Sequence, residues 1–115
     1  MHLTFVETPI FTRQVTDFLD DDAYRNFQND LLADPERGDL MVGCRGLRKA
    51  RMALPGRGKS GGARVIYLHL KQHSTIYLFY LFRKFDAANL TRTERNELAA
   101  LCDQIKAAYA KKRSS

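Results

Sequence analysis

Two runs of aliphatic, β-branched and aromatic residues, separated by four residues, limit the fold of this 115-residue chain more than any other feature. The runs are Ala63 to Leu70 ("ARVIYLHL") and Thr75 to Phe82 ("TIYLFYLF"), and the segment between them is "KQHS". Residues of these types are enriched in strands that have a buried face. We therefore expect two central strands of a sheet, joined by a short turn.

The remaining segments predict an α+β domain built around these strands. A helical pair precedes them, since Thr8 and Pro9 resemble a helix start and the run of aspartates at 20–22 resembles a second one. The expected elements are an opening strand at 2–7, a helical hairpin at 8–33, strands at 40–42 and 47–54, and a last helix at 92–112. This order favours an antiparallel-rich sheet with helices mainly on one side and charges displayed on the other. We expect one domain, 1–115, with a frayed tail at 110–115.

Charge is unevenly distributed along the chain. Between Asp39 and Asp86 there are ten lysines and arginines and no acidic residue, although the net charge of the whole chain is only +6. The rest of the chain has nine basic and thirteen acidic residues. Such asymmetry predicts a polyanionic partner for the middle segment. The alternative is a solvated face that only keeps the chain soluble.

The strand expected at 47–54 sorts its cations by the period of two. Lys49 and Arg51 share one face, whereas Arg48 lies on the other with Ala50 and Met52. A glycine-rich loop at 55–62 adds Arg57 and Lys59, and Arg64 follows at the start of the next strand. Adjacent strands thus bring several cations together, and we expect Arg64 to face Lys49.

Several common kinds of site are excluded by the residues. No paired carboxylates lie near the basic segment, which argues against glycosidase chemistry and against a Mg²⁺ site. His69 and His73 have no third ligand, so we expect no metal. The "GKS" triplet is not a phosphate-binding loop, because that motif needs glycine at the position of Ala53 and a helix after it.

The two cysteines and the apolar runs predict the compartment. Cys44 and Cys102 form neither a zinc pattern nor an expected disulfide. No apolar run approaches the roughly 20 residues that span a bilayer, and no secretory signal is recognisable. We expect a cytoplasmic protein that needs no cofactor and binds no membrane.

The cation cluster suits RNA in two ways. It neutralises phosphates, and it can stabilise the extra negative charge that develops when a ribose 2′-hydroxyl attacks the adjacent phosphate. Cleavage of that type needs a base, and a lysine serves when neighbouring cations lower its pKa. Lys49, next to Arg48 and Arg51, is the candidate. From the residues alone, binding without cleavage is an equally good interpretation.

The chain resembles the RelE/ParE superfamily of type II toxin–antitoxin toxins, and most closely its HigB-like branch. The resemblance covers nearly the whole chain and rests on "TFVETPIF", "DPERGDLMVGCRGLRKARM", "GRGKSGGARVIY" and "YLFRKFDAANLTRTERNEL". It implies a RelE-like fold and a ribosome-dependent endonuclease that cuts messenger RNA in the A site of the 70S ribosome. The implied reaction uses the 2′-hydroxyl as nucleophile and no metal.

The resemblance also implies roles for individual residues. Lys49 and Arg51 match the family's paired lysines, Arg64 matches the arginine that opens the following strand, and Lys84 matches the lysine after the last strand. Arg64 would stabilise the transition state, Lys49 would be the general base, and Arg51 and Lys84 would contact phosphate and leaving group. More diffuse RNA contacts are expected from Arg45, Arg48, Arg57 and Lys59.

Two departures from the family pattern leave the general acid open. Phe85 stands where relatives have an arginine, and Leu90 stands where they have a catalytic tyrosine. Tyr80 within a strand and Tyr109 on an apolar helix face are not obvious substitutes. The implied partner is a cognate antitoxin, a helix-turn-helix protein. The rival functions are a ParE-like gyrase poison and a non-catalytic RNA-binding module.

Overall fold

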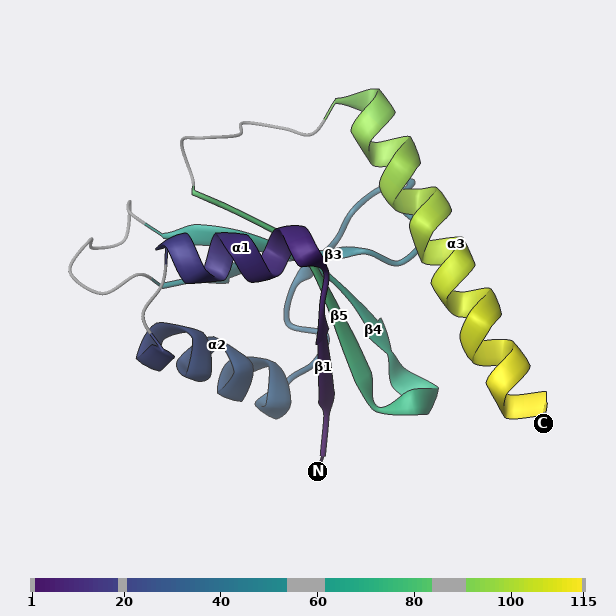
Figure 1. The fold of residues 1–115 in the computed structure, drawn as a ribbon, viewed down its shortest axis with the longest axis horizontal. Helices are drawn as coiled ribbons and strands as arrows, with labels where there is room; N and C mark the ends of the chain where they lie inside the picture. Colours follow the sequence, from purple (N-terminus) through teal and green to yellow (C-terminus); the bar gives the residue numbers. More distant parts are fainter. Residues whose placement is uncertain (1, 19–20, 54–61, 84–90, 115) are drawn as a thin grey trace.

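The computed structural model describes residues 2–18, 21–53, 62–83 and 91–114, and these form a five-stranded sheet with three helices (Figure 1). In chain order the elements are β1 (Thr4–Glu7), α1 (Pro9–Phe18), α2 (Asp21–Ala33), β2 (Asp39–Leu40), β3 (Arg48–Met52), β4 (Ala63–Leu70), the 3-10 turn η2 (Lys71–His73), β5 (Thr75–Arg83) and α3 (Arg92–Ser114). The α+β class is confirmed. The expected strands at 2–7, 40–42 and 47–54 are shorter in the structure, and the last helix extends further than expected.

The sheet has the order β1-β5-β4-β3-β2, so β4 lies at its centre. β1 runs parallel to β5, and every other pair is antiparallel. The two strands predicted as central, Ala63 to Leu70 and Thr75 to Phe82, are β4 and β5, joined by η2. Among the described helices, none has both the length and the apolar character required to cross a membrane.

One face of the sheet packs against α1 and α2. Phe11, Phe27 and Leu31 are fully buried against Val65 and Tyr67 of β4. Each such side chain contributes roughly 1.5–3 kcal/mol by leaving water. This helical hairpin is the one that the sequence predicts, and its position fixes the side of the sheet on which the larger core lies.

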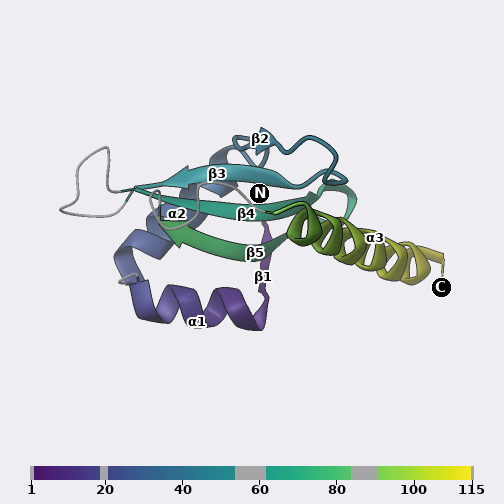
Figure 2. The same ribbon diagram turned by 90° about the horizontal axis from the view of Figure 1, so that it is seen from above.

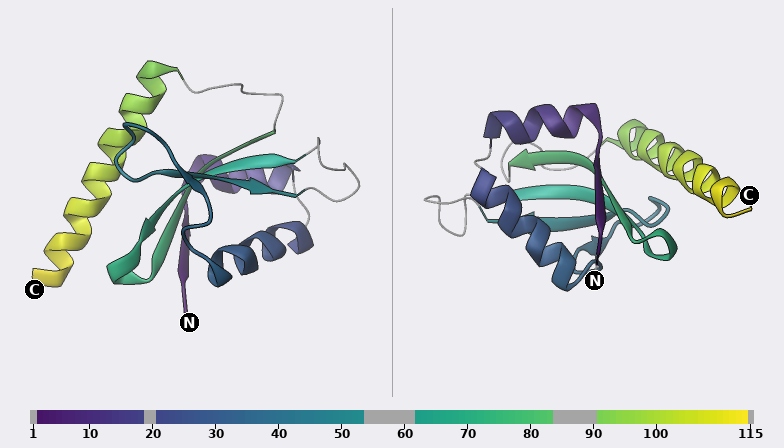
Figure 3. Two further views of the ribbon diagram at one scale, coloured as in Figure 1. Left: turned by 180° about the vertical axis from the view of Figure 1, so that it is seen from behind. Right: turned by 60° about the horizontal axis from the view of Figure 1, so that its bottom comes forward.

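The other face is partly covered by α3, which differs from our expectation that the helices lie mainly on one side. Figure 3 shows α3 apart from α1 and α2 in both views. A second cluster joins Leu98, Cys102, Ile105 and Tyr109 of α3 to apolar residues of the sheet and of the segment before β3, namely Leu47, Ile66, Leu68, Leu70 and Phe79. The physical reason is that the strands are apolar on both faces, so both faces need cover.

α3 leaves one end of this second face open. In Figure 2, α3 lies toward the opposite end of the strands from the point where β3 ends and β4 begins. The cluster that joins α3 to the sheet includes Ile66, Leu68 and Leu70 of β4 but not Arg64. Among the described residues, no helix covers the end that carries Arg64, and we expect the cations of β3 and β4 to meet a ligand there.

A bulge in β5 changes which face its side chains take. The pairing with β4 shifts between Ile66, which is opposite Tyr80, and Tyr67, which is opposite Leu78. Phe79 is the extra residue. Because of it, Leu78 and Leu81 both lie in the cluster under α1 and α2, whereas Phe79, Tyr80 and Phe82 belong to the cluster on the second face.

Threonine side chains cap the starts of α1 and α3, and the first of these caps is the helix start that Thr8 and Pro9 indicate. The Thr8 hydroxyl accepts a hydrogen bond from Phe11 N at 3.1 Å and so caps α1. At the start of α3, Glu94 N donates to Thr91 Oγ1 at 3.0 Å and Thr91 N donates to Glu94 Oε1 at 2.9 Å. This reciprocal pair is a capping box.

Candidate functional site

The register of β3 and β4 places two arginines side by side. Arg51 is directly opposite Arg64, and Lys49 is directly opposite Ile66. All four side chains point to the face that α3 only partly covers. The expectation that Lys49 and Arg51 share a face with Arg64 is thus correct, but the residue that Arg64 faces is Arg51 and not Lys49.

Two rows of side chains cross this end of the sheet. The first consists of Arg51, Arg64 and Phe82, and the second consists of Asp39, Lys49, Ile66 and Tyr80. We call the end of the sheet formed by these rows the basic face; its Ile66 is buried and its Lys49 and Arg51 are exposed. It combines cations from β3 and β4 with two aromatic rings from β5, which is the composition of surfaces that bind single-stranded nucleic acid.

The cations of the basic face are accessible. Lys49 and Arg51 are exposed and Arg64 is half-buried. The Arg64 guanidinium donates through Nη1 to the carbonyl of Ala63 at 3.3 Å, and that bond uses only one of its donors. Among the described residues, neither Lys49 nor Arg64 is ion-paired with a carboxylate. The positive charges of Lys49 and Arg64 can therefore interact with a phosphate.

One carboxylate lies beside this cluster, which the charge pattern of the sequence did not indicate. Asp39 on the edge strand β2 is the cross-strand partner of Lys49 and is exposed. Neighbouring side chains of opposite charge on one face of a sheet attract each other. Asp39 therefore belongs to the site as a second candidate for proton transfer.

Close packing of glycine fixes the backbone under these side chains. A Cβ atom at Gly38 would lie 3.0 Å from the carbonyl oxygen of Lys49 and 2.9 Å from the Tyr67 ring. A Cβ atom at Gly62 would lie 3.1 Å from the carbonyl oxygen of Met52. Only glycine allows these approaches without displacing β3, so these two positions hold the strand that carries Lys49 and Arg51.

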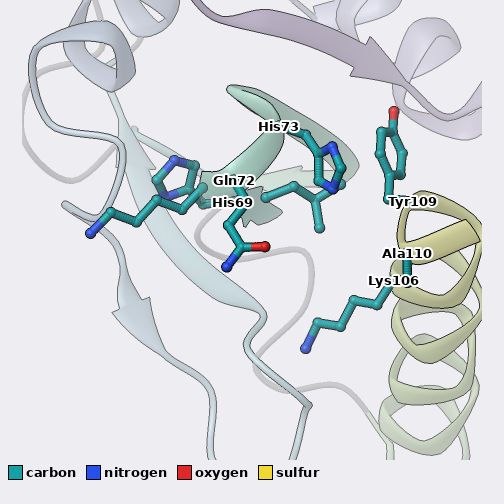
Figure 4. Close-up of a pocket in the computed structure, with 8 residues that line it drawn as sticks. His69, Gln72, His73, Lys106, Tyr109 and Ala110 are labelled. Carbon is teal, nitrogen blue, oxygen red and sulfur yellow. The ribbon is translucent and has the colours of Figure 1, made fainter. Parts of the chain in front are cut away.

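A pocket at the opposite end of β4 is a separate feature (Figure 4). It has a volume of about 460 Å³ and is lined by His69, Leu70, Lys71, Gln72, His73, Lys106, Tyr109 and Ala110. Two of its polar side chains contact other parts of the chain. Lys106 Nζ donates to the carbonyl of Arg45 at 2.5 Å, and the His73 ring packs edge-on against Tyr109 at 4.8 Å. His69 Nδ1 lies 3.4 Å from Glu36 Oε2 without hydrogen-bond geometry.

No metal site exists among the described residues, because no three histidine, cysteine, aspartate or glutamate side chains gather within them. His69 and His73 both line the pocket, and no third metal-ligating side chain of the described residues joins them there. The basic face itself offers cations and aromatic rings, with Asp39 as its only carboxylate in the two rows.

Comparison with known proteins identifies the family. The family model for the RelE toxin of the RelE/RelB toxin–antitoxin system matches residues 33–114. The chain belongs to the RelE toxin family. The matched segment contains β2, β3, β4, β5 and α3, and therefore both rows of the basic face.

A solved structure of a RelE toxin supports the fold. The free form of the E. coli toxin RelE, carrying two arginine-to-alanine substitutions, superimposes with a TM-score of 0.55 at 12% identity. The similarity covers 76% of this chain and 90% of that chain. At this identity the likeness concerns the fold, and the HigB-like branch within the superfamily stays a prediction.

Arg45 and Arg48, which are predicted to bind RNA, also contact other residues of this RelE-family chain. Arg48 lies on the face under α1 and α2, as its place in the strand predicts, and donates to the carbonyls of Glu36 at 3.0 Å and Gly38 at 2.7 Å. Arg45, with φ of 58°, lies 3.7 Å from Asp103 of α3. Their RNA contacts stay predictions, and the structure gives both residues a role in holding the turns around β2.

The other predicted residues lie outside the described part of the chain. These are Arg57 and Lys59 of the glycine-rich segment, Lys84 after β5, and the departures Phe85 and Leu90. The residues that sequence reasoning did not place in the site are Asp39, Tyr80 and Phe82. A simple alternation of two puts Tyr80 on the face of Leu78, and the bulge that reverses this has no local sequence signal.

Proposed function

We propose that this RelE-family chain cleaves messenger RNA on the ribosome as the toxin of a toxin–antitoxin pair. The observation that carries the proposal is the position of Arg64 directly opposite Arg51, with Lys49 two residues along the same face, at the end of the sheet that α3 leaves open. Two guanidinium groups side by side offer positive charge and hydrogen-bond donors to a phosphodiester and to the second negative charge that develops during attack.

The proposed reaction is attack by a ribose 2′-hydroxyl on the adjacent phosphate. The bond from the 2′-oxygen to phosphorus forms, the bond from phosphorus to the 5′-oxygen breaks, and a 2′,3′-cyclic phosphate and a free 5′-hydroxyl result. Arg64 stabilises the charge that develops on the phosphoryl oxygens. Arg51 and Lys84 contact the phosphate and the leaving group, and no metal takes part.

Lys49 is assigned as the base that takes the proton of the 2′-hydroxyl. Asp39, its cross-strand partner, is the alternative acceptor that the structure adds. Lys49→Ala and Asp39→Asn separate the two assignments, because the loss of the base lowers the single-turnover rate by about 10²–10⁴-fold and changes its pH profile. Loss of a residue that only binds phosphate weakens binding and leaves the pH profile unchanged.

The proposed partners follow from the same surface. The site of action is the A site of the 70S ribosome in the cytoplasm, where a single-stranded codon is exposed. A cognate helix-turn-helix antitoxin would neutralise the toxin by covering the basic face or by displacing an element beside it. Arg45, Arg48, Arg57 and Lys59 are proposed to add contacts with ribosomal RNA.

The test is to map messenger-RNA ends after brief expression of the chain. We expect codon-linked cuts inside reading frames and growth arrest, both lost in Arg64→Ala. The matched control is Arg25→Ala, which removes the same charge from an exposed position on α2. Thermal unfolding of both variants tests whether their stability equals that of wild type.

Two other results would select a rival function. Intact messages with DNA damage during arrest would indicate a gyrase poison of the ParE type. Salt-sensitive binding to ribosomes without any new message ends would indicate a non-catalytic RNA-binding module. Either result would overturn the nuclease proposal.

A further inference from the structure

The chain has five tyrosines, and the hydroxyl of Tyr80 differs from the hydroxyls of the other four. Tyr24 donates to Glu7, Tyr67 bonds Pro35 and Gly38, and Tyr77 bonds Tyr109. The Tyr80 hydroxyl forms no hydrogen bond with a described residue, although its ring packs against Phe82 at a centroid distance of 6.1 Å. Four phenols thus serve the fold, and the fifth is available to a ligand.

The register places Tyr80 diagonally beside Arg64. Arg64 is opposite Arg51 on one side and opposite Phe82 on the other. Lys49 on β3 and Tyr80 on β5 are therefore its diagonal neighbours on its two flanks, each with a Cα separation of about 7–8 Å. Both are within reach of a phosphate that the Arg64 guanidinium holds.

This arrangement has the symmetry that the chemistry requires. In attack by a 2′-hydroxyl, the attacking and leaving oxygens lie roughly in line on opposite sides of phosphorus. A base is needed at one side and an acid at the other. Lys49 and Tyr80 stand on opposite sides of Arg64, and a neutral phenol is a proton donor.

We propose that Tyr80 is the general acid that protonates the leaving 5′-oxygen, an inference that rests on the proposed function. The bond from phosphorus to the 5′-oxygen breaks while the Tyr80 hydroxyl gives its proton to that oxygen. The base on the other flank takes the proton of the 2′-hydroxyl, and solvent returns both groups to their starting forms. The ring of Tyr80, with Phe82, lies against the nucleotide that leaves.

The bulge in β5 is what makes this possible. If β5 alternated regularly and had no bulge, Tyr80 would lie on the face of Leu78, under α1 and α2. Bulges are frequent beside functional sites because they redirect a side chain. Here the redirected side chain is the one whose hydroxyl has no partner among the described residues.

The experiment compares leaving groups on programmed ribosomes. The site that the wild-type toxin cuts is mapped first, and two messages are then made with a bridging oxygen or a bridging sulfur at the 5′ position of that site. A thiolate leaves without protonation. We expect Tyr80→Phe to cut the oxygen message about 10²–10⁴-fold more slowly than wild type does, and to cut the sulfur message within tenfold of wild type.

Controls separate this inference from the proposed function. Arg64→Ala should be slow on both messages, and Tyr77→Phe, which removes a phenol from the same strand, should resemble wild type on both. Rapid cleavage of the sulfur message also shows that Tyr80→Phe is folded. If wild type cuts and Tyr80→Phe is equally fast on oxygen, or equally slow on both messages, Tyr80 is not the acid and the nuclease function stands. If the first mapping finds no message that wild type cuts, both proposals fail.

Discussion

The side-chain oxygen of Gln14 accepts a hydrogen bond from the backbone nitrogen of Leu81 at 2.7 Å, across 67 positions of the sequence. Thr8, at the start of the same helix, donates from its hydroxyl to the carbonyl of Phe79 at 2.9 Å, and its nitrogen donates to Leu78 at 3.1 Å. α1 therefore supplies the partners of the backbone groups at the bulge in β5. The face on which Tyr80 and Phe82 lie depends on a helix that contributes no residue to the basic face.

Replacing Gln14 with leucine should destabilise the fold and lower activity together. The nitrogen of Leu81, a residue that is 1% exposed, would lose its acceptor, which costs roughly 1–3 kcal/mol. Thermal unfolding and the rate of message cleavage measure the two effects. Gln14→Glu is the matched control, because a carboxylate still accepts the bond. Equal stability of wild type and Gln14→Leu would show that the bulge does not need α1.

Arg48 should matter for stability more than for RNA. Its guanidinium donates to the carbonyls of Glu36 and Gly38, so Arg48→Ala should lower the free energy of unfolding by about 1 kcal/mol. Chemical denaturation measures this change. The salt dependence of RNA binding should change less in Arg48→Ala than in Arg64→Ala, and the opposite order with unchanged stability of Arg48→Ala would contradict the assignment.

Arg51 and Arg64 should contribute to RNA binding through counterion release. Each alanine variant should reduce the slope of log affinity against log salt concentration by about one, in titrations with a single-stranded oligonucleotide. Arg25→Ala on α2 should leave the slope unchanged. A slope equal to that of wild type in both Arg51→Ala and Arg64→Ala would place the phosphate contacts elsewhere.

The capping box of α3 should add an acid-sensitive part to stability. Hydrogen bonds from the backbone nitrogen and then the side chain of Thr91 hold the pKa of Glu94 below its ordinary value. A lowered pKa in the folded state means that this stabilisation is complete above the unfolded pKa and is lost as pH falls through the folded one. Glu94→Gln keeps the acceptor without titrating, so its melting temperature should vary less with pH below about pH 4.5. Parallel pH profiles would exclude this role.

The cysteines should react only when the fold opens. Burial raises the pKa of the Cys102 thiol to about 11, and Cys44 and Cys102 are 1% and 0% exposed. Because the thiolate is the reactive form, alkylation at pH 8 should be roughly a hundredfold slower in the native chain than in urea. Mass spectrometry after timed labelling measures both rates. Fast labelling of Cys102 in the folded chain would contradict the burial.

The sequence by itself determined the elements and the sorting of the cations. The apolar runs that became β4 and β5 predict strands from residue type, and Thr8 with Pro9 predicts the start of α1 from local hydrogen bonding. The period of two in β3 puts Lys49 and Arg51 on one face and Arg48 on the other. These features depend on neighbours within a few positions, so a local pattern carries them.

Only the tertiary structure decided the composition of the site. The register placed Arg64 opposite Arg51 and Asp39 opposite Lys49, and α3 covered part of the face that was expected to be free. The bulge moved Tyr80 to the basic face because Gln14 and Thr8 satisfy the backbone there. Such contacts join residues far apart in the chain, and their energy is set by packing and by backbone hydrogen bonds that no short stretch of sequence specifies.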